Sequence, residues 1–128
     1  MKTARVLFVE DSPIHIKLML HHLRTAGYNV VKGQAVDLPG LVKALEAPWD
    51  LAIIDCIIPG YDGMAALKTI KAYHPWIECI VISGIVGEEM EATALAAGAR
   101  AFVGKLSLSR MIDVAKEVLN DGRGSDNL

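Results

Sequence analysis

The sequence has little cysteine, no long apolar run and no excess of positive charge. Its two cysteines, Cys56 and Cys79, do not form a C-x-x-C pair, which argues against a zinc site and against a disulfide framework. No apolar run reaches the roughly 18 residues of a membrane span, and the apolar stretch after Arg5 ends at Glu10, too early for a signal peptide. The formal net charge of −2 offers no broad electrostatic surface for nucleic acid or for an anionic membrane. We therefore expect a soluble, cytoplasmic protein that directly contacts neither nucleic acid nor a membrane.

The composition predicts one folded domain. Apolar residues make up 52% of the 128 positions and charged residues 22%, as in a globular protein rather than a disordered one. A chain of this length buries enough surface to fold without a metal or a disulfide. We expect the domain to span residues 1–121, and residues 122–128, rich in glycine and polar residues, to form a flexible tail or the start of a linker.

Five short apolar runs alternate with five segments that have helical patterns. The runs, each too short to be a buried helix, are residues 5–9, 30–33, 51–54, 79–82 and 101–103. The expected helix starts are Ser12-Pro13, Asp37, Asp62, Glu88 and Ser107. Three- and four-residue spacing predicts an inward face on each of the first three helices. These faces contain Ile16, Met19, Leu20 and Leu23, then Leu38, Leu41, Val42 and Leu45, then Met64, Leu67 and Ile70.

This alternation predicts an α/β fold, a doubly wound, flavodoxin-like three-layer sandwich with a parallel sheet. The first, third and fourth strands are nearly pure aliphatic, which is typical of strands covered on both faces. The second and fifth contain more polar or small residues and suit the edges, so the pattern favours the strand order 2-1-3-4-5. In such a sheet the ligand crevice lies beyond the carboxyl ends of the strands, where the order reverses between strands one and three.

Polar residues follow the strands that end at this crevice. They are Glu10 and Asp11 after the first strand, Asp55 after the third, Ser83 after the fourth and Lys105 after the fifth. Three carboxylates at one edge repel one another unless a cation joins them, and oxygen ligands without histidine or cysteine suit Mg²⁺ or Mn²⁺. Asp55 could then accept a phosphoryl group as a nucleophile, with Ser83 and Lys105 donating to the phosphoryl oxygens.

The segments that contain these residues resemble those of the response-regulator receiver domain, the phosphoacceptor module of two-component signalling, of the chemotaxis-regulator type. The matching segments are residues 9–12, 55–63, 81–84 and 98–105, and the resemblance covers about residues 4–121. It implies that Asp55 takes a phosphoryl group from a histidine kinase or a histidine phosphotransfer protein. The ligands that it implies for Mg²⁺ or Mn²⁺, directly or through water, are Glu10, Asp11, Asp55 and the backbone carbonyl of Ile57.

The resemblance also implies a switch. Ser83 and Phe102 match the hydroxyl and aromatic positions of the family, in which the hydroxyl moves to the phosphoryl group and the ring turns inward on phosphorylation. The face formed by the fourth helix, the fifth strand and the fifth helix then passes the signal to an output domain or to a second copy in a homodimer. The segments after Ser83 and after Lys105 are similar to those of receivers in multidomain sensory proteins.

One residue, Leu106, departs from the family pattern, which usually has proline after the lysine and a cis peptide bond between them. A cis bond costs roughly 3–4 kcal/mol before a non-proline residue and under about 1 kcal/mol before proline. We therefore expect a trans Lys105–Leu106 bond and an altered loop.

Two apolar residues, Ile57 and Ile85, each stand two positions after a site residue. We expect them to hinder an attacking water and so to make the phosphoryl group long-lived. A lifetime of seconds in the presence of Mg²⁺, or an unchanged rate in Ile57→Asn, would contradict this expectation.

Two other functions stay open from the sequence. One is a phosphate-independent interaction module with a vestigial site, for which the departure at Leu106 would have to matter greatly. The other is a small Mg²⁺-dependent aspartyl phosphohydrolase of the haloacid-dehalogenase type, although Glu10-Asp11-Ser12 differs from its D-x-D motif and the chain has no room for a cap. We expect a receiver, and not an enzyme that acts on an outside substrate.

Three histidines, His15, His21 and His22, fall on the first helix, away from its apolar face. Polar residues at such positions usually face solvent. We therefore expect all three on the surface, without a role in metal binding or phosphotransfer.

Overall fold

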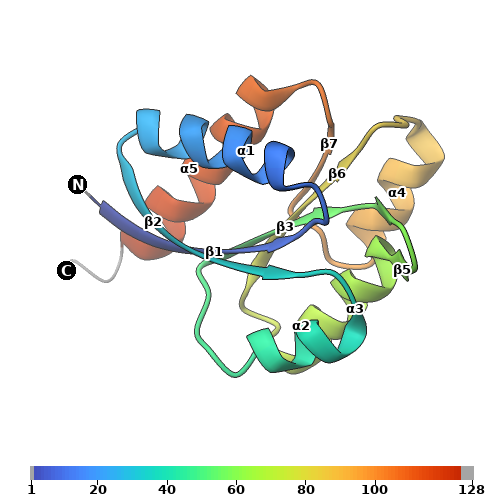
Figure 1. Cartoon of the computed structure of the whole chain (residues 1–128). Helices are drawn as coiled ribbons and strands as arrows, with labels where there is room; N and C mark the ends of the chain where they lie inside the picture. The colour runs from blue at the N-terminus through green and yellow to red at the C-terminus, as the bar shows by residue number, and fades with distance from the viewer. Residues whose placement is uncertain (1, 125–128) are drawn as a thin grey trace.

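A parallel sheet lies at the centre of the protein, with helices on both of its faces (Figure 1). In the computed structural model, which describes residues 2–124, its five strands are β1 (Lys2–Val9), β2 (Tyr28–Ala35), β3 (Leu51–Asp55), β6 (Glu78–Ser83) and β7 (Ala101–Gly104). The helices of this part are α1 (Pro13–Thr25), α2 (Leu38–Ala44), α3 (Gly63–Tyr73), α4 (Glu88–Ala96) and α5 (Leu108–Gly124). The strand order β2-β1-β3-β6-β7 confirms the predicted α/β fold with the order 2-1-3-4-5.

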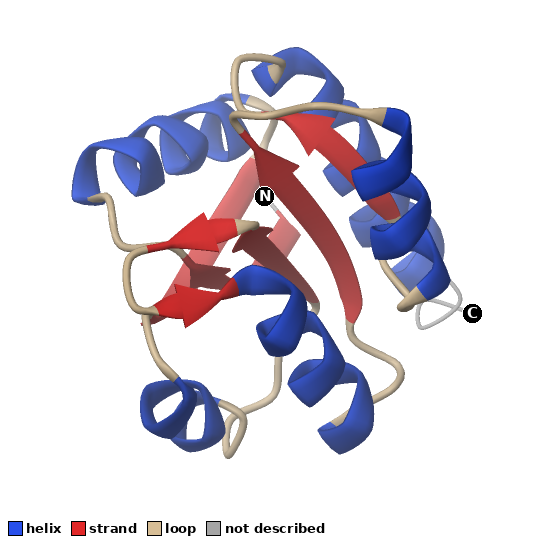
Figure 2. Cartoon of the chain, turned by 90° about the vertical axis from the view of Figure 1, so that its right-hand side faces the viewer, coloured by secondary structure: helices blue, strands red, loops and turns tan. Residues whose placement is uncertain are grey.

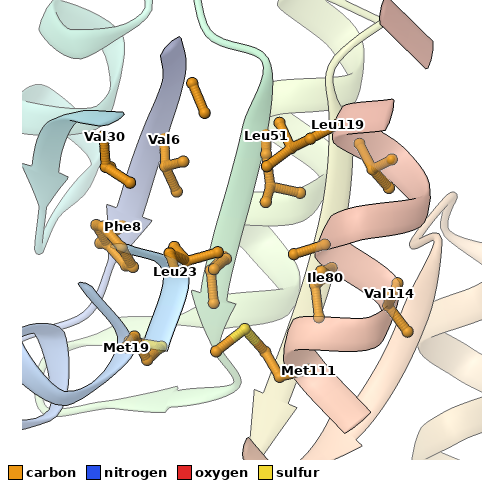
Figure 3. Close-up of a cluster of buried hydrophobic side chains, with 14 of the residues drawn as sticks. Val6, Phe8, Met19, Leu23, Val30, Leu51, Ile80, Met111, Val114 and Leu119 are labelled. Carbon is orange, nitrogen blue, oxygen red and sulfur yellow. The ribbon is translucent and has the colours of Figure 1, made fainter. Parts of the chain in front are cut away.

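Side chains of the strands alternate between the two faces of the sheet and build a hydrophobic cluster on each. Phe8 and Ile53 pack with α1 and α5, whereas Leu7 and Ile54 pack with α2, α3 and α4. Figure 3 shows the first cluster, in which Phe8 lies among side chains of the neighbouring strands and of the helices, including Leu23 of α1. Because helices cover both faces, β3 is buried along its whole length, as its aliphatic sequence predicts.

The helices begin at the predicted capping residues. The hydroxyl of Ser12 accepts a hydrogen bond from the backbone N–H of His15 (3.2 Å) at the start of α1. Asp37 caps α2 and Asp62 caps α3 in the same way. Each cap pairs an N–H group that the helix itself leaves without a partner. Because Ser12 follows the acidic pair 10–11 directly, α1 starts at the crevice.

A short antiparallel hairpin precedes α3 (Figure 2). It consists of β4 (Ile57–Ile58) and β5 (Tyr61–Asp62), joined by Pro59 and Gly60. Gly60 has a φ of 80°, a conformation that glycine adopts without strain. The sequence predicts the turn but not the pairing of the two strands, since two-residue strands have no recognisable periodicity.

Two local expectations are corrected. Leu38, predicted on the inward face of α2, is 48% exposed, because only about two turns of this helix form and Leu41 is its one buried residue. The second strand is longer than the predicted run 30–33, since β2 pairs with β1 over eight residues, from Tyr28 to Ala35. Its polar residues are tolerated because β2 is an edge strand.

The last helix extends to Gly124, into the segment that was predicted as a tail from residue 122. Residues 125–128 of that predicted tail lie outside the described residues. Along the described chain, every helix is too short or too polar to cross a membrane.

Candidate functional site

The register of the sheet brings the polar strand-end residues together. The last pair between β1 and β3 is Val9 with Ile54, so Glu10 and Asp55 both come directly after this pair. On the other side of β3, β6 ends at Ser83, which pairs with Gly104 of β7, one residue before Lys105. The predicted crevice residues therefore lie at one edge of the sheet, although tens of residues separate them in the sequence.

Three carboxylates form a cluster at this edge. One oxygen each from Glu10, Asp11 and Asp55 lies within 4.8 Å of the others, close enough to share one metal ion. Glu10 and Asp55 are buried (0% and 3% exposed), whereas Asp11 is exposed. Buried carboxylates at this spacing repel one another, and hard oxygen ligands fit Mg²⁺ or Mn²⁺. The donor set therefore fits a divalent cation of this kind.

Lys105 supplies the positive charge that touches this cluster. Its Nζ donates to Oδ2 of Asp55 at 2.9 Å and lies 3.9 Å from Oε2 of Glu10. Burial lowers the pKa of Lys105, but the hydrogen bond to Asp55 and the charges of the acids outweigh burial, so its pKa is raised. The other carboxylate oxygen of Asp55 accepts the backbone N–H of Ile57 (3.1 Å). One lysine thus faces three carboxylates, which leaves the cluster short of positive charge.

Glu10 has a raised pKa in this environment. Burial is the largest cause and the neighbouring Asp55 adds to it, while the hydrogen bond from the backbone N–H of Ser12 (3.1 Å) lowers the pKa in part. The result is a pKa of about 7. Binding of a cation would favour the ionised carboxylate, so protons and metal compete at Glu10.

The two predicted switch residues lie on β6 and β7, the strands that follow β3 in the sheet. Ser83 is fully buried, and its Oγ accepts the backbone N–H of Ile85 at 3.1 Å. Phe102 of β7 is 4% exposed and packs in the cluster under α2, α3 and α4. Its ring is thus already in the inward position that the family resemblance assigns to the phosphorylated state.

His15 was expected on the surface, and the structure corrects this. Its side chain is 12% exposed, and Nδ1 lies 3.4 Å from Oε2 of Glu10. Burial lowers the pKa of His15, as does the charge of Lys105, while Asp55 raises it in part. The helical pattern missed this residue because the acidic loop, and not solvent, lies beside the first turn of α1. The five-residue spacing from Glu10, together with the Ser12 cap, is the signal that could have found it.

The peptide bond after Lys105 agrees with the sequence prediction. Residues 2–124 contain no cis peptide bond, so the Lys105–Leu106 bond is trans, as expected. The backbone N–H of Lys105 donates to the carbonyl of Ser83 (2.7 Å), which ties the loop to the end of β6. Leu106 is 99% exposed.

Exposed apolar side chains stand close in sequence to the site residues. The sequence analysis named two of them, Ile57 and Ile85, and missed the others. Each stands within three residues of a site residue, and each is more than half exposed. They are Ile14, Ile57, Ile85, Val86 and Leu106, which we term the apolar rim. Large apolar side chains gathered around a polar site are typical of a surface that contacts another protein.

Comparisons with known proteins point to one family. A family model described as the response regulator receiver domain matches residues 6–116. The chain is 30% identical over 115 residues to the transcriptional regulatory protein ZraR of Salmonella typhimurium. The aligned segment covers 89% of this chain and 26% of that protein. It is 31% identical over 103 residues to the chemotaxis protein CheY of Treponema pallidum, and this alignment covers 79% of this chain and 72% of that protein. The chain thus spans about a quarter of the length of the first of these relatives.

Solved structures share the fold over nearly the whole chain. A CheY-like response regulator receiver domain protein from Methanospirillum hungatei has a TM-score of 0.81 and 25% identity, with 97% of this chain and 99% of that chain covered. A chain of the CheX–CheY–BeF3–Mg²⁺ complex from Borrelia burgdorferi has a TM-score of 0.77 and 26% identity, with 90% and 88% covered.

Proposed function

Since the chain belongs to the response regulator receiver domain family, we propose that it is a phosphoryl-accepting switch of a two-component system, with Asp55 as the phosphoacceptor. The observation that carries the proposal is the contact of Lys105 with Asp55 at 2.9 Å inside the carboxylate cluster. A lone acid at a strand end would be solvated, whereas Asp55 is buried, and each of its oxygens has a donor. This arrangement suits a carboxylate that takes on further negative charge.

The transfer that we propose is a simple displacement at phosphorus. A carboxylate oxygen of Asp55 forms the new P–O bond while the P–N bond of a phosphohistidine breaks, and the electron pair of that bond stays on the imidazole, which takes up a proton. The phosphoryl group brings nearly two negative charges, and Lys105 is in place to donate to its oxygens. The charge of a bound Mg²⁺ or Mn²⁺ would offset these negative charges. The ligands that we propose for this cation are Glu10, Asp11, Asp55 and the Ile57 carbonyl.

The proposed output is a shift of the surface formed by α4, β7 and α5. We propose that the Ser83 hydroxyl leaves Ile85 for the phosphoryl group, and that Phe102 keeps its inward position when it does so. α4 is suited to movement because Ala94 is its one fully buried residue and its N-cap, Gly87, makes no side-chain hydrogen bond. In this proposal the protein is a switch, and not an enzyme that acts on an outside substrate; the surface would contact an output domain or a second copy.

The proposed phosphodonor is a histidine kinase or a histidine phosphotransfer protein. The apolar rim supports a protein donor, because a small phosphate compound would need no apolar surface around the site. Leu106, 99% exposed beside Lys105, is the residue of the rim that is easiest to change without disturbing the fold.

The test of the phosphoacceptor is incubation with acetyl phosphate and Mg²⁺, followed by intact mass measurement. We expect one added phosphoryl group in the wild type and in Asp113→Ala, a control at an exposed position of α5, and none in Asp55→Ala. Absence of the adduct in the wild type, with acetyl phosphate and with protein donors, would favour the vestigial interaction module instead.

A second measurement tests the protein donor. With a phosphorylated histidine phosphotransfer domain that serves the wild type, we expect Leu106→Asp to slow phosphotransfer at least about tenfold, because it places a charge in an apolar contact. Leu95→Asp, a control at an exposed position of α4, should not slow it. The rate with acetyl phosphate should be the same in all three proteins, and an unchanged rate of Leu106→Asp with the protein donor would argue against docking through the rim.

A further inference from the structure

His15 connects the first turn of α1 to the carboxylate cluster. Its Nδ1 lies 3.4 Å from Oε2 of Glu10, and its backbone N–H donates to Oγ of Ser12 (3.2 Å). The N–H of Ser12 in turn donates to Oε1 of Glu10 (3.1 Å). Both carboxylate oxygens of Glu10 therefore have a partner at the start of α1.

Glu10 depends on such partners more than the two aspartates do. A glutamate has one more rotatable bond than an aspartate, so the backbone alone determines the position of its oxygens less closely. Glu10 is also fully buried, so no water from the surface can take over the role of a lost partner at low cost. Groups that hydrogen-bond to a metal-binding carboxylate orient it and strengthen metal binding.

We propose that His15 is a positioning residue, which donates from Nδ1 to Glu10 and holds this carboxylate in the orientation in which it serves the metal site. The inference rests on the proposed function, because it concerns the same divalent cation. It goes beyond that function in assigning a role to a side chain that is not one of the proposed ligands or phosphoryl donors.

The contacts of the imidazole indicate which tautomer is present. In the side chains described, Nε2 of His15 is buried and has no hydrogen-bond partner. When Glu10 is ionised, a proton on Nδ1 makes the contact attractive, whereas an unprotonated Nδ1 would place a lone pair against the carboxylate. In the metal-loaded protein, Nδ1 of His15 should therefore have a proton.

The first test compares Mg²⁺ dissociation constants, measured by calorimetry, in four proteins. We expect His15→Leu to weaken Mg²⁺ binding about tenfold, the lower end of the effect of removing a hydrogen-bond partner of a metal ligand. His15→Asn should stay within about threefold of the wild type, because its amide nitrogen can donate from nearly the position of Nδ1. The control His21→Leu changes an exposed histidine of the same helix and should bind like the wild type.

The second test needs no variant and is therefore independent of any folding defect. Nitrogen-15 NMR of the imidazole in the Mg²⁺-loaded wild type should show a proton on Nδ1 of His15. A proton on Nε2 with a bare Nδ1 would overturn the inference, as would a folded His15→Leu that binds Mg²⁺ as tightly as the wild type.

The two proposals fail in different ways. If the wild type accepts a phosphoryl group on Asp55 and binds Mg²⁺, but His15→Leu binds Mg²⁺ equally well, only the role of His15 is wrong. If the wild type binds no Mg²⁺, both the proposed function and the role of His15 are wrong.

Discussion

Glu10 behaves differently from the other acids of the site because it is fully buried beside Asp55. Its pKa of about 7 means that the folded protein favours its protonated form. In the absence of metal, its contribution to stability is therefore complete below its ordinary pKa of 4.5 and is lost as the pH rises through about 7. A cation has the opposite dependence, since it binds the ionised carboxylate only.

We predict that Mg²⁺ binds more weakly at low pH because of Glu10. One proton that competes with a pKa of about 7 makes the affinity roughly tenfold lower near pH 6 than near pH 8. Calorimetry at the two pH values measures this. Glu10→Gln should bind Mg²⁺ more weakly and with a much smaller pH dependence, and a wild-type affinity that is equal at both values would show that Glu10 does not compete with protons.

At the scale of elements, the start of α3 lies unusually close to the end of β3. Gly63, the first residue of α3, donates its N–H to the carbonyl of Cys56 (3.1 Å). A Cβ at this position would overlap the carbonyl oxygen of Asp55 and lie 2.7 Å from Cα of Cys56. Because these neighbours are backbone atoms, they have no side-chain freedom with which to make room.

We predict that Gly63→Ala destabilises the protein by about 2–3 kcal/mol, the upper part of the range for a forced overlap in a packed interior. Urea unfolding measures the change in the free energy of unfolding. Gly84→Ala is the matched control, since a Cβ there meets no atom within 4 Å, and it should change the stability by less than about 0.5 kcal/mol. Equal effects of the two substitutions would mean that the close approach of α3 to β3 does not constrain the fold.

For the whole molecule, the cluster couples metal binding to stability. The carboxylates of Glu10, Asp11 and Asp55 come together only in the folded chain. Among the lysines and arginines of the described residues, only Lys105 contacts them. A cation that binds the folded state and not the unfolded chain stabilises the fold by mass action.

We predict that Mg²⁺ raises the melting temperature. At about 100 times its dissociation constant, the stabilisation is about 2.7 kcal/mol, or roughly 10 °C for a domain of this size. Differential scanning calorimetry measures it, with NaCl at equal ionic strength as a control for screening. Asp11→Asn should lose most of the effect of Mg²⁺, and a rise of the same size with NaCl would mean that the response is general screening.

Features that depend on local sequence could be predicted. The inward face of α1 is an example, since Ile16, Met19, Leu20 and Leu23 are all buried as their spacing indicates. Helix caps such as Ser12 and the trans bond after Lys105 were also predicted correctly, because each depends on neighbouring residues only. Three features were not predicted. The hairpin β4–β5 and the length of β2 depend on strand pairing, and the exposure of Leu38 depends on the length of α2.

The sequence by itself determined the order of the strands and which polar residues stand at their ends, because both depend on hydrophobic pattern along the chain. Only the tertiary structure decided that Lys105 contacts Asp55, 50 residues away, that His15 faces Glu10, and that burial raises the pKa of Glu10. The apolar rim likewise became visible only when the loops met at one edge of the sheet. Distances and burial arise from packing between distant segments, and such packing leaves no periodic signal in the sequence.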